Sequence, residues 1–376
     1  EFFTLIADGE EVVDLDVRLG YNHRGIEKLS ESKTFDQGTF LVERICGICS
    51  TSHPYAYTRA VEDVFPMEVP ERAKYIRTII AEGERIHSHL LWLGLAGHFL
   101  GYNTVYMWVW KLREEILDVM ELLSGNRNNY AMFRPGGVRR NPPPDVIETV
   151  LQKLDSIVPT LEMLRDAILD DPVLHARLKG VGVLSREKAI AYSALGPTSR
   201  ASGVERDVRQ DSPYGAYDRV DWKVITASNG DVFDKAVVRI LETFESVSII
   251  RQCVDKLPDG PIDAGIEWVP PGEGIGHIEA PRGETFHYVR SDGTNRPIRH
   301  KVRAPPFMTL PTFKETVVGS SLADATIILA SIDPCYCCTE RIAVRKEDGS
   351  RSMMGPDLIQ MSRRKTAEIR RELTGK

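Results

Sequence analysis

Two pairs of cysteines near opposite ends of the chain constrain its fold more than any other feature. Cys46 and Cys49 lie in the segment Arg-Ile-Cys-Gly-Ile-Cys, and Cys335 and Cys338 lie in Asp-Pro-Cys-Tyr-Cys-Cys. A Cys-x-x-Cys spacing lets two thiolates bind one metal from a single turn of backbone. The pairs can share a metal only if folding brings together two segments that are separated by most of the 376 residues.

The spacing leaves the kind of metal open. Four thiolates suit zinc, an iron–sulfur cluster or another soft transition metal. Structural zinc sites usually take their pairs from segments about 15–20 residues apart, so the long separation argues against zinc. Gly47 lets the backbone approach a metal closely. His53 can donate a hydrogen bond to a thiolate sulfur, although an ordinary polar histidine in a helix is the other interpretation.

Composition excludes several classes of function. The hydrophobic content of 42% and charged content of 27% are typical of soluble globular proteins. A net charge of -6, without a basic cluster interleaved with aromatic residues, argues against nucleic-acid binding. The most apolar stretch, residues 90–110, is interrupted by His98 and several glycines, so we expect no transmembrane segment. Six cysteines, of which Cys253 and Cys337 fall outside the pairs, indicate a reducing cytoplasm. Because strand-like residues follow Glu1 directly, we expect that N-terminal sequence is missing.

The residue patterns predict an α+β fold, with a mainly helical bundle core and small peripheral β-sheets. Apolar residues recur every three or four positions in long segments, which predicts helices over 70–90, 105–123, 146–169, 232–257 and 313–329. Shorter alternating segments predict a hairpin that turns at Asp8-Gly9, and late strands over 276–280, 286–289 and 299–302.

We expect a single domain over residues 1–376, because the two cysteine pairs bracket nearly the whole helical region. Its expected parts are a β-hairpin region (1–30), a helical core (31–260), a β region (270–305), a segment with a helix and the second pair (306–341), and a C-terminal tail (342–376).

Several blocks of sequence together resemble a known family. The first pair reads Arg-x-Cys-Gly-x-Cys-x-x-x-His and the second reads Asp-Pro-Cys-x-x-Cys-x-x-Arg. Further matching blocks are Gly20–Lys28, Glu84–His89, Glu279–Glu284 and Val302–Pro305. These motifs resemble the large subunit of nickel–iron hydrogenases. Arg341, in place of the usual His, resembles the energy-converting, membrane-bound branch, which is related to the 49 kDa-type subunit of complex I.

The resemblance implies a nickel–iron centre in which all four paired cysteines bind nickel. By position, Cys46 and Cys335 would be terminal ligands, and Cys49 and Cys338 would also bridge to iron. The iron would carry CO and CN ligands made by maturation proteins. The remaining implied site residues are His53, hydrogen-bonded to a bridging thiolate, Arg282, poised over the metals, and Pro305, which would contact the cofactor. Cys335 or Arg282 would be the first proton acceptor.

Some positions depart from the family pattern. Glu27 stands where uptake hydrogenases place a magnesium ligand, but the partner His of that site is here Arg341, so we expect a Glu27–Arg341 ion pair rather than magnesium. Pro306 stands where relatives often have a hydroxyl that donates to a cyanide. Many relatives are cleaved just after the position of Arg341, whereas this chain continues beyond it.

The resemblance implies reversible oxidation of hydrogen at the cytoplasmic face of a membrane. Electrons would leave through iron–sulfur clusters in a partner small subunit, with ferredoxin as the distal partner, and membrane-embedded subunits would couple turnover to ion translocation. One alternative is a related membrane oxidoreductase that reduces sulfur compounds or a quinone. Another is a non-catalytic, metal-stapled assembly subunit.

Overall fold

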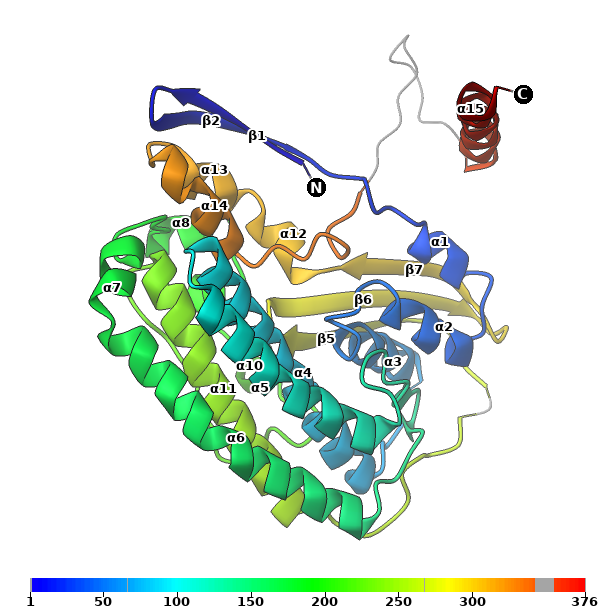
Figure 1. The fold of residues 1–376 in the computed structure, drawn as a ribbon. Helices are drawn as coiled ribbons and strands as arrows, with labels where there is room; N and C mark the ends of the chain where they lie inside the picture. Colours follow the sequence, from blue (N-terminus) through cyan, green and yellow to red (C-terminus); the bar gives the residue numbers. More distant parts are fainter. Residues whose placement is uncertain (1, 66, 267, 342–354, 376) are drawn as a thin grey trace.

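Four long helices form the core of the molecule. The computed structural model describes residues 2–65, 67–266, 268–341 and 355–375. The bundle helices are α4 (Glu71–Phe99), α5 (Asn103–Ser124), α6 (Pro144–Asp170) and α11 (Val232–Asp255) (Figure 1). Helix α4 packs on α5 and α11 and is buried along most of its length. The helices predicted over 70–90, 105–123, 146–169 and 232–257 fall on these four elements.

A three-stranded antiparallel sheet lies beside the bundle. Its strands are ordered β5 (Pro271–Ala280), β6 (Gly283–Asp292) and β7 (Pro297–Arg303). Helix α3 (Ser52–Val64) packs on β5 and β6, and this contact requires glycine on β5. A Cβ atom at Gly276 would lie 2.0 Å from the Ala56 carbonyl oxygen, and one at Gly274 would lie 2.1 Å from that of Ala60. Helices α1 (Ile26–Ser30) and α2 (Phe35–Glu43) complete this side, α1 against β7 and α2 against α3.

The chain begins with a hairpin formed by β1 (Phe2–Asp8) and β2 (Glu11–Arg18). Asp8 pairs with Glu11, so the tight turn is Gly9-Glu10, one residue later than predicted. The hairpin packs on α13 (Thr312–Val317) and α14 (Leu322–Ser331).

The prediction of one helix over 313–329 is wrong, because the chain breaks between α13 and α14. Gly319 has a φ of +83°, which ends α13, and its N–H donates to the Val12 carbonyl at 2.8 Å. The Leu322 N–H donates to the Glu10 carbonyl at 2.8 Å, and the Ser321 hydroxyl caps α14. Two backbone N–H groups that would hydrogen-bond within a continuous helix therefore bond to the hairpin instead.

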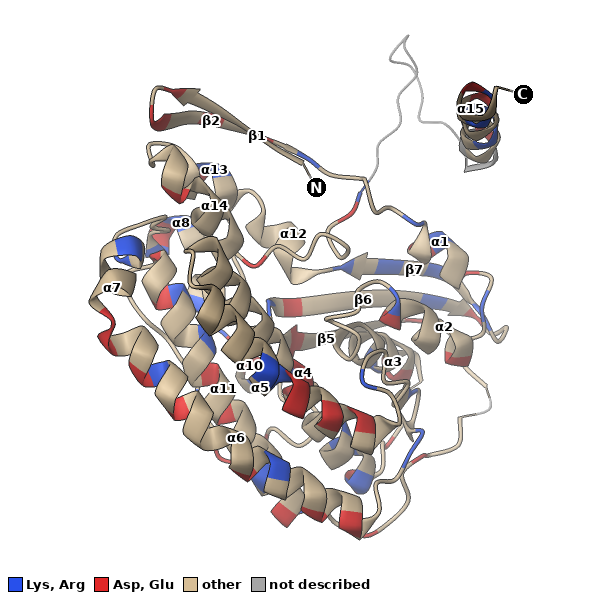
Figure 2. Ribbon diagram, viewed as in Figure 1, with Lys and Arg blue, Asp and Glu red and all other residues tan. Residues whose placement is uncertain are grey.

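Shorter elements connect these parts. They are β3 (Phe133–Arg134), β4 (Gly137–Val138), α7 (Pro172–Leu178), α8 (Arg186–Ala191), α9 (Gly196–Arg200), α10 (Val208–Asp211) and α12 (Pro305–Thr309). Helix α15 (Gly355–Thr374) stands apart from the rest of the chain and, like α6, carries charges of both signs (Figure 2). In the described ranges, no helix combines the length and apolar character needed to cross a bilayer. The expected α+β class, with a helical core and small sheets, is confirmed.

Candidate metal centre

The fold brings the two cysteine pairs together in the interior. Cys46 and Cys49 lie in the loop between α2 and α3, and Cys335 and Cys338 lie in the loop that follows α14. The four sulfur atoms all lie within 4.8 Å of one another, and all four residues are buried. Within the described residues this is the single cluster of three or more potential metal ligands.

The chemistry of these four thiols fits a bound cation. The thiols of Cys335, Cys338 and Cys49 donate hydrogen bonds to Cys46 and hold the pKa of Cys46 well below its usual range. Burial raises the pKa of Cys338 well above its usual range. Four buried thiolates within 4.8 Å of one another would repel each other strongly. A soft metal ion removes this conflict and matches four sulfur donors.

His53 contacts this cluster from the first turn of α3. Its Nε2 lies 3.3 Å from the Cys338 Sγ. Of the two cysteines predicted to bridge, Cys49 and Cys338, His53 therefore contacts Cys338. The helix begins here because the Glu84 carboxylate of α4 accepts from the Thr51 and Ser52 backbone N–H groups. Burial raises the pKa of Glu84 to about 7 and lowers the pKa of His53 to about 4. His53 is therefore a neutral imidazole with one N–H group.

Arg282 reaches the cluster from the turn between β5 and β6. Its Nη1 lies 3.5 Å from the Cys49 Sγ and 3.0 Å from the Ser88 hydroxyl. The Asp333 carboxylate pairs with Nη2 at 2.8 Å, and the Asp333 carbonyl accepts from Nε at 3.1 Å. Burial alone lowers the pKa of Arg282, but Asp333 and the Cys49 sulfur outweigh burial and hold this pKa well above its usual range. The guanidinium is therefore a fixed positive charge beside the sulfur atoms.

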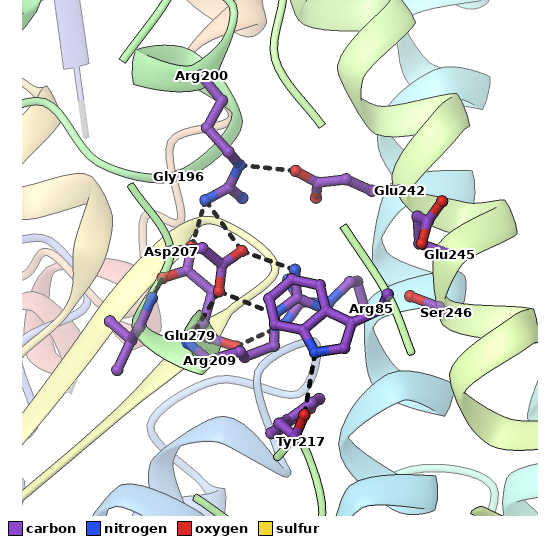
Figure 3. A network of polar contacts seen from close by, with 12 residues as sticks. Arg85, Gly196, Arg200, Asp207, Arg209, Tyr217, Glu242, Glu245, Ser246 and Glu279 are labelled. Atoms are coloured by element: carbon purple, nitrogen blue, oxygen red, sulfur yellow. Dashed lines mark hydrogen bonds and ion pairs between the residues drawn. The ribbon is translucent and has the colours of Figure 1, made fainter. Parts of the chain in front are cut away.

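The Arg282 turn rests on a buried ionic network (Figure 3). Arg85 of α4 donates to the carbonyls of Glu279 at 2.6 Å and Ala280 at 3.3 Å, just before the turn. Arg200 pairs with the carboxylates of Glu242 and Glu279, each at 2.8 Å. The network also contains Glu82, Asp207, Arg209, Tyr217 and Ser246. Because these groups are almost fully enclosed, each charge requires its partners, and the network fixes the backbone that carries Arg282.

Glu27 lies near the second cysteine pair with two cations around it. Lys301 Nζ lies 3.0 Å from its carboxylate, and the Val302 N–H also donates to it at 3.0 Å. Arg341 Nη2 lies farther away, at 3.9 Å, and donates to the Val302 carbonyl at 2.6 Å. The expected pairing of Glu27 with Arg341 is thus present at long range, and the sequence analysis missed Lys301 as the nearer cation. A surface pocket lined by Glu27, Arg341 and Cys338 opens here.

Two further predicted residues lie where β7 ends. Pro305 is buried and begins α12, directly after β7. Pro306 follows it in the first turn, and as a proline it offers neither a hydroxyl nor an N–H. Cys337, outside the pairs, is partly exposed, and the Asn22 amide lies 3.9 Å from its sulfur.

The sequence analysis did not assign roles to several residues that support the site. Ser88 and Glu84 lie four residues apart in one quoted block, so a helical pattern places them on the same face. Asp333 directly precedes the second pair, and its φ of +57° lets both its carbonyl and its carboxylate face Arg282. His287 and His300, described below, gave no signal, because single histidines in strands have no distinguishing spacing.

Comparisons with known proteins agree with this geometry. The family described as the 49 Kd subunit of respiratory-chain NADH dehydrogenase matches residues 100–268 and 264–341, and the nickel-dependent hydrogenase family matches residues 24–95. Over its whole length the chain is 41% identical to the membrane-bound hydrogenase subunit alpha of Pyrococcus furiosus, of which it covers 92%. It is 39% identical to the carbon monoxide-induced hydrogenase of Rhodospirillum rubrum, over 90% of this chain and 95% of that protein. A solved structure of the membrane-bound sulfane sulfur reductase, an archaeal respiratory membrane complex, matches with a TM-score of 0.86 and 32% identity, covering 90% of this chain and 94% of that one.

Proposed function

Because the chain belongs to the family of membrane-bound nickel–iron hydrogenase large subunits and their 49 kDa-type relatives in complex I, we propose that it catalyses reversible hydrogen oxidation in a membrane-bound complex. The observation that carries the proposal is the convergence of four buried cysteine sulfurs within 4.8 Å. Four sulfur donors suit a nickel–iron site, and Cys46, Cys49, Cys335 and Cys338 would hold it.

A nickel–iron centre supplies, when bound, a Lewis-acidic and redox-active metal pair that can split hydrogen heterolytically. The residues of this chain control the surroundings of that reaction. Arg282 brings a fixed positive charge to the sulfur atoms and, with Pro305, would contact the cofactor. Since Asp333 keeps Arg282 charged, Cys335 is the better candidate of the two proposed proton acceptors. His53 would donate a hydrogen bond to the Cys338 thiolate.

Electrons and ions would pass through partner subunits. We expect an iron–sulfur small subunit, because the described residues hold no second cysteine cluster. The membrane-bound relatives support membrane-embedded partners, with this chain as a peripheral subunit on the cytoplasmic face. Ferredoxin as acceptor, ion translocation, and CO and CN ligands supplied by maturation proteins complete the proposal. The Lys301 and Arg341 cations support the absence of magnesium at Glu27.

The test is elemental analysis of the native complex, together with hydrogen-dependent dye reduction. We expect one nickel and at least one iron per chain, infrared bands from metal-bound CO and CN, and hydrogen uptake. A complex that contains full-length chain and partner subunits but no nickel would contradict the proposal.

A second candidate is the reduction of sulfur compounds. The specific observation in its favour is the structural match to the sulfane sulfur reductase complex over 90% of the chain. The two functions separate in one experiment, in which the purified complex is supplied with either hydrogen and a dye or a polysulfide and a reduced electron donor. Sulfide production without hydrogen uptake would favour the second candidate.

A further inference from the structure

Three histidines and one serine form an unbroken chain of polar contacts that starts at Cys338. His53 Nδ1 lies 3.1 Å from His287 Nε2, and His287 Nδ1 lies 2.9 Å from His300 Nε2. His300 Nδ1 lies 2.8 Å from the Ser30 hydroxyl, which lies 2.7 Å from the Glu27 carbonyl oxygen. The chain thus crosses from α3 through β6 and β7 to the end of α1.

This chain of polar contacts is buried away from solvent and is continuous. His53 is 1% exposed, and His287, His300 and Ser30 are fully buried. Both nitrogens of each imidazole lie within hydrogen-bonding distance of a partner in the chain or of the Cys338 sulfur. The Tyr57 ring packs edge-on against His300 at 5.1 Å and against His287 at 6.2 Å, so the neighbouring surface is aromatic. A buried imidazole that uses both nitrogens has a fixed orientation, and its tautomer is set by its neighbours.

The number of hydrogens in the chain is one too few for its contacts. Each contact between two imidazole nitrogens, at 3.1 Å and 2.9 Å, needs one nitrogen that donates and one that accepts. A neutral imidazole offers one of each, because it carries one N–H group and one bare nitrogen. With the Ser30 hydroxyl, four hydrogens serve five contacts, from the Cys338 sulfur to the Glu27 carbonyl.

The Cys338 sulfur at one end and the Glu27 carbonyl at the other compete for these hydrogens. The chain of contacts therefore has two possible polarities, that is, two directions in which its hydrogens can point. Every contact from His53 to Ser30 needs a hydrogen, because two lone pairs that face each other at 2.8–3.1 Å repel. If Ser30 donates to the Glu27 carbonyl, every N–H then points away from Cys338, and His53 presents a bare nitrogen to the sulfur. If the His53 N–H points at Cys338, every hydrogen turns toward the sulfur, and Ser30 donates to His300. A metal-bound thiolate accepts hydrogen bonds and cannot donate them. A thiolate at Cys338 therefore selects the second polarity.

We propose that His287, His300 and Ser30 are positioning residues that act through His53 and hold its N–H toward the Cys338 sulfur. The inference rests on the proposed metal centre, because the chain has this polarity only when Cys338 is a thiolate. A hydrogen bond to a ligating thiolate stabilises its negative charge and raises the reduction potential of the metal. Residues on β6, β7 and α1 that do not contact the metal ligands would thus tune the centre.

The test compares variants of the purified complex by nickel content, nickel electron paramagnetic resonance and the midpoint potential of the centre. His300→Phe fills the same space but cannot continue the chain, so we expect altered nickel g-values and a lower potential at normal nickel content. His300→Gln keeps an amide that can donate to His287 and accept from Ser30, so we expect a return toward wild-type values.

Ser30→Ala removes the donor at the far end of the chain of contacts, so the remaining hydrogen bonds polarise one another less. We expect a smaller fall in potential in the same direction. The matched control is Ser124→Ala, since Ser124 is also buried but its hydroxyl bonds only to the Met120 carbonyl and to the Asn126 backbone carbonyl and N–H. We expect its spectrum and potential to equal those of the wild type.

The outcomes separate this inference from the proposed function. Wild-type complex without nickel would overturn the proposed function, and the inference with it. Wild-type complex with nickel, and His300→Phe and Ser30→Ala with unchanged spectra and potentials, would overturn the inference alone. If His300→Phe fails to retain nickel, Ser30→Ala decides, and an unchanged potential in that variant contradicts the positioning role.

Discussion

Replacing Arg282 with lysine tests the role of its guanidinium at the centre. Arg282 uses three nitrogens in different directions, toward Asp333, Ser88 and Cys49. Lysine keeps the positive charge but has one compact ammonium group. If that group pairs with Asp333, it cannot also keep the 3.5 Å contact to the Cys49 sulfur and the 3.0 Å contact to Ser88. The variant therefore removes a directed donor beside the metal and preserves the net charge.

The magnitude follows from the loss of that donor. Removing one preorganised donor from the reacting centre of an enzyme costs about 100- to 1000-fold in turnover, or about 2.7–4 kcal/mol of transition-state stabilisation. We expect a loss of this size in hydrogen-dependent dye reduction by Arg282→Lys. Nickel content should not change, because the four cysteine ligands are untouched.

Arg77→Lys is the matched control. Arg77 is also buried and pairs through its guanidinium with Glu62 at 2.6 Å, but its other hydrogen bonds go to the Gly137 and Arg134 carbonyls. It should lose thermal stability and keep its turnover per nickel. Arg282→Lys with full nickel content and near wild-type turnover would refute the reasoning, and Arg282 would then have a structural role only.

Three further predictions concern the ligands and the charged interior. Cys335→Ser should lose nickel, measured as the nickel-to-protein ratio. Cys253→Ser is the control and should keep its nickel, because Cys253 is buried away from the cluster. Equal nickel in both variants would contradict the ligand assignment. Arg200→Met should lower the free energy of unfolding by about 3–5 kcal/mol, because buried carboxylates lose their counter-charge; denaturant titration against wild type checks this. The His277 hydrogen bond and Arg303 lower the pKa of Glu284 from 4.5 to about 2, so the stability contributed by this carboxylate is present above pH 4.5 and lost as the pH falls toward 2. As the pH falls from 4.5 toward 2, the melting temperature of Glu284→Gln should fall less than that of the wild type. If the two plots of melting temperature against pH are parallel, Glu284 contributes no stability in this range.

The predicted helices succeeded where apolar periodicity was strong, and their ends were missed for identifiable reasons. The first long helix was followed only to Leu90, because the glycines after it resemble breaks, whereas α4 continues to Phe99. A Cβ atom at Gly94 would lie 2.9 Å from the Trp110 ring, so this glycine permits close packing of α4 on α5 and does not end the helix. Local propensity does not distinguish these two uses of glycine.

The sequence by itself determined the donor chemistry of the centre. Cysteine spacing is a local property, and a Cys-x-x-Cys segment presents two sulfurs wherever the chain places it. The tertiary structure alone decided how those sulfurs are surrounded: Asp333 and Ser88 aim Arg282, and strands β6 and β7 connect His53 to Ser30. The physical reason is that a hydrogen bond between distant segments depends on a few tenths of an ångström and on an angle. Only the packing of α3, the sheet and the bundle sets those quantities.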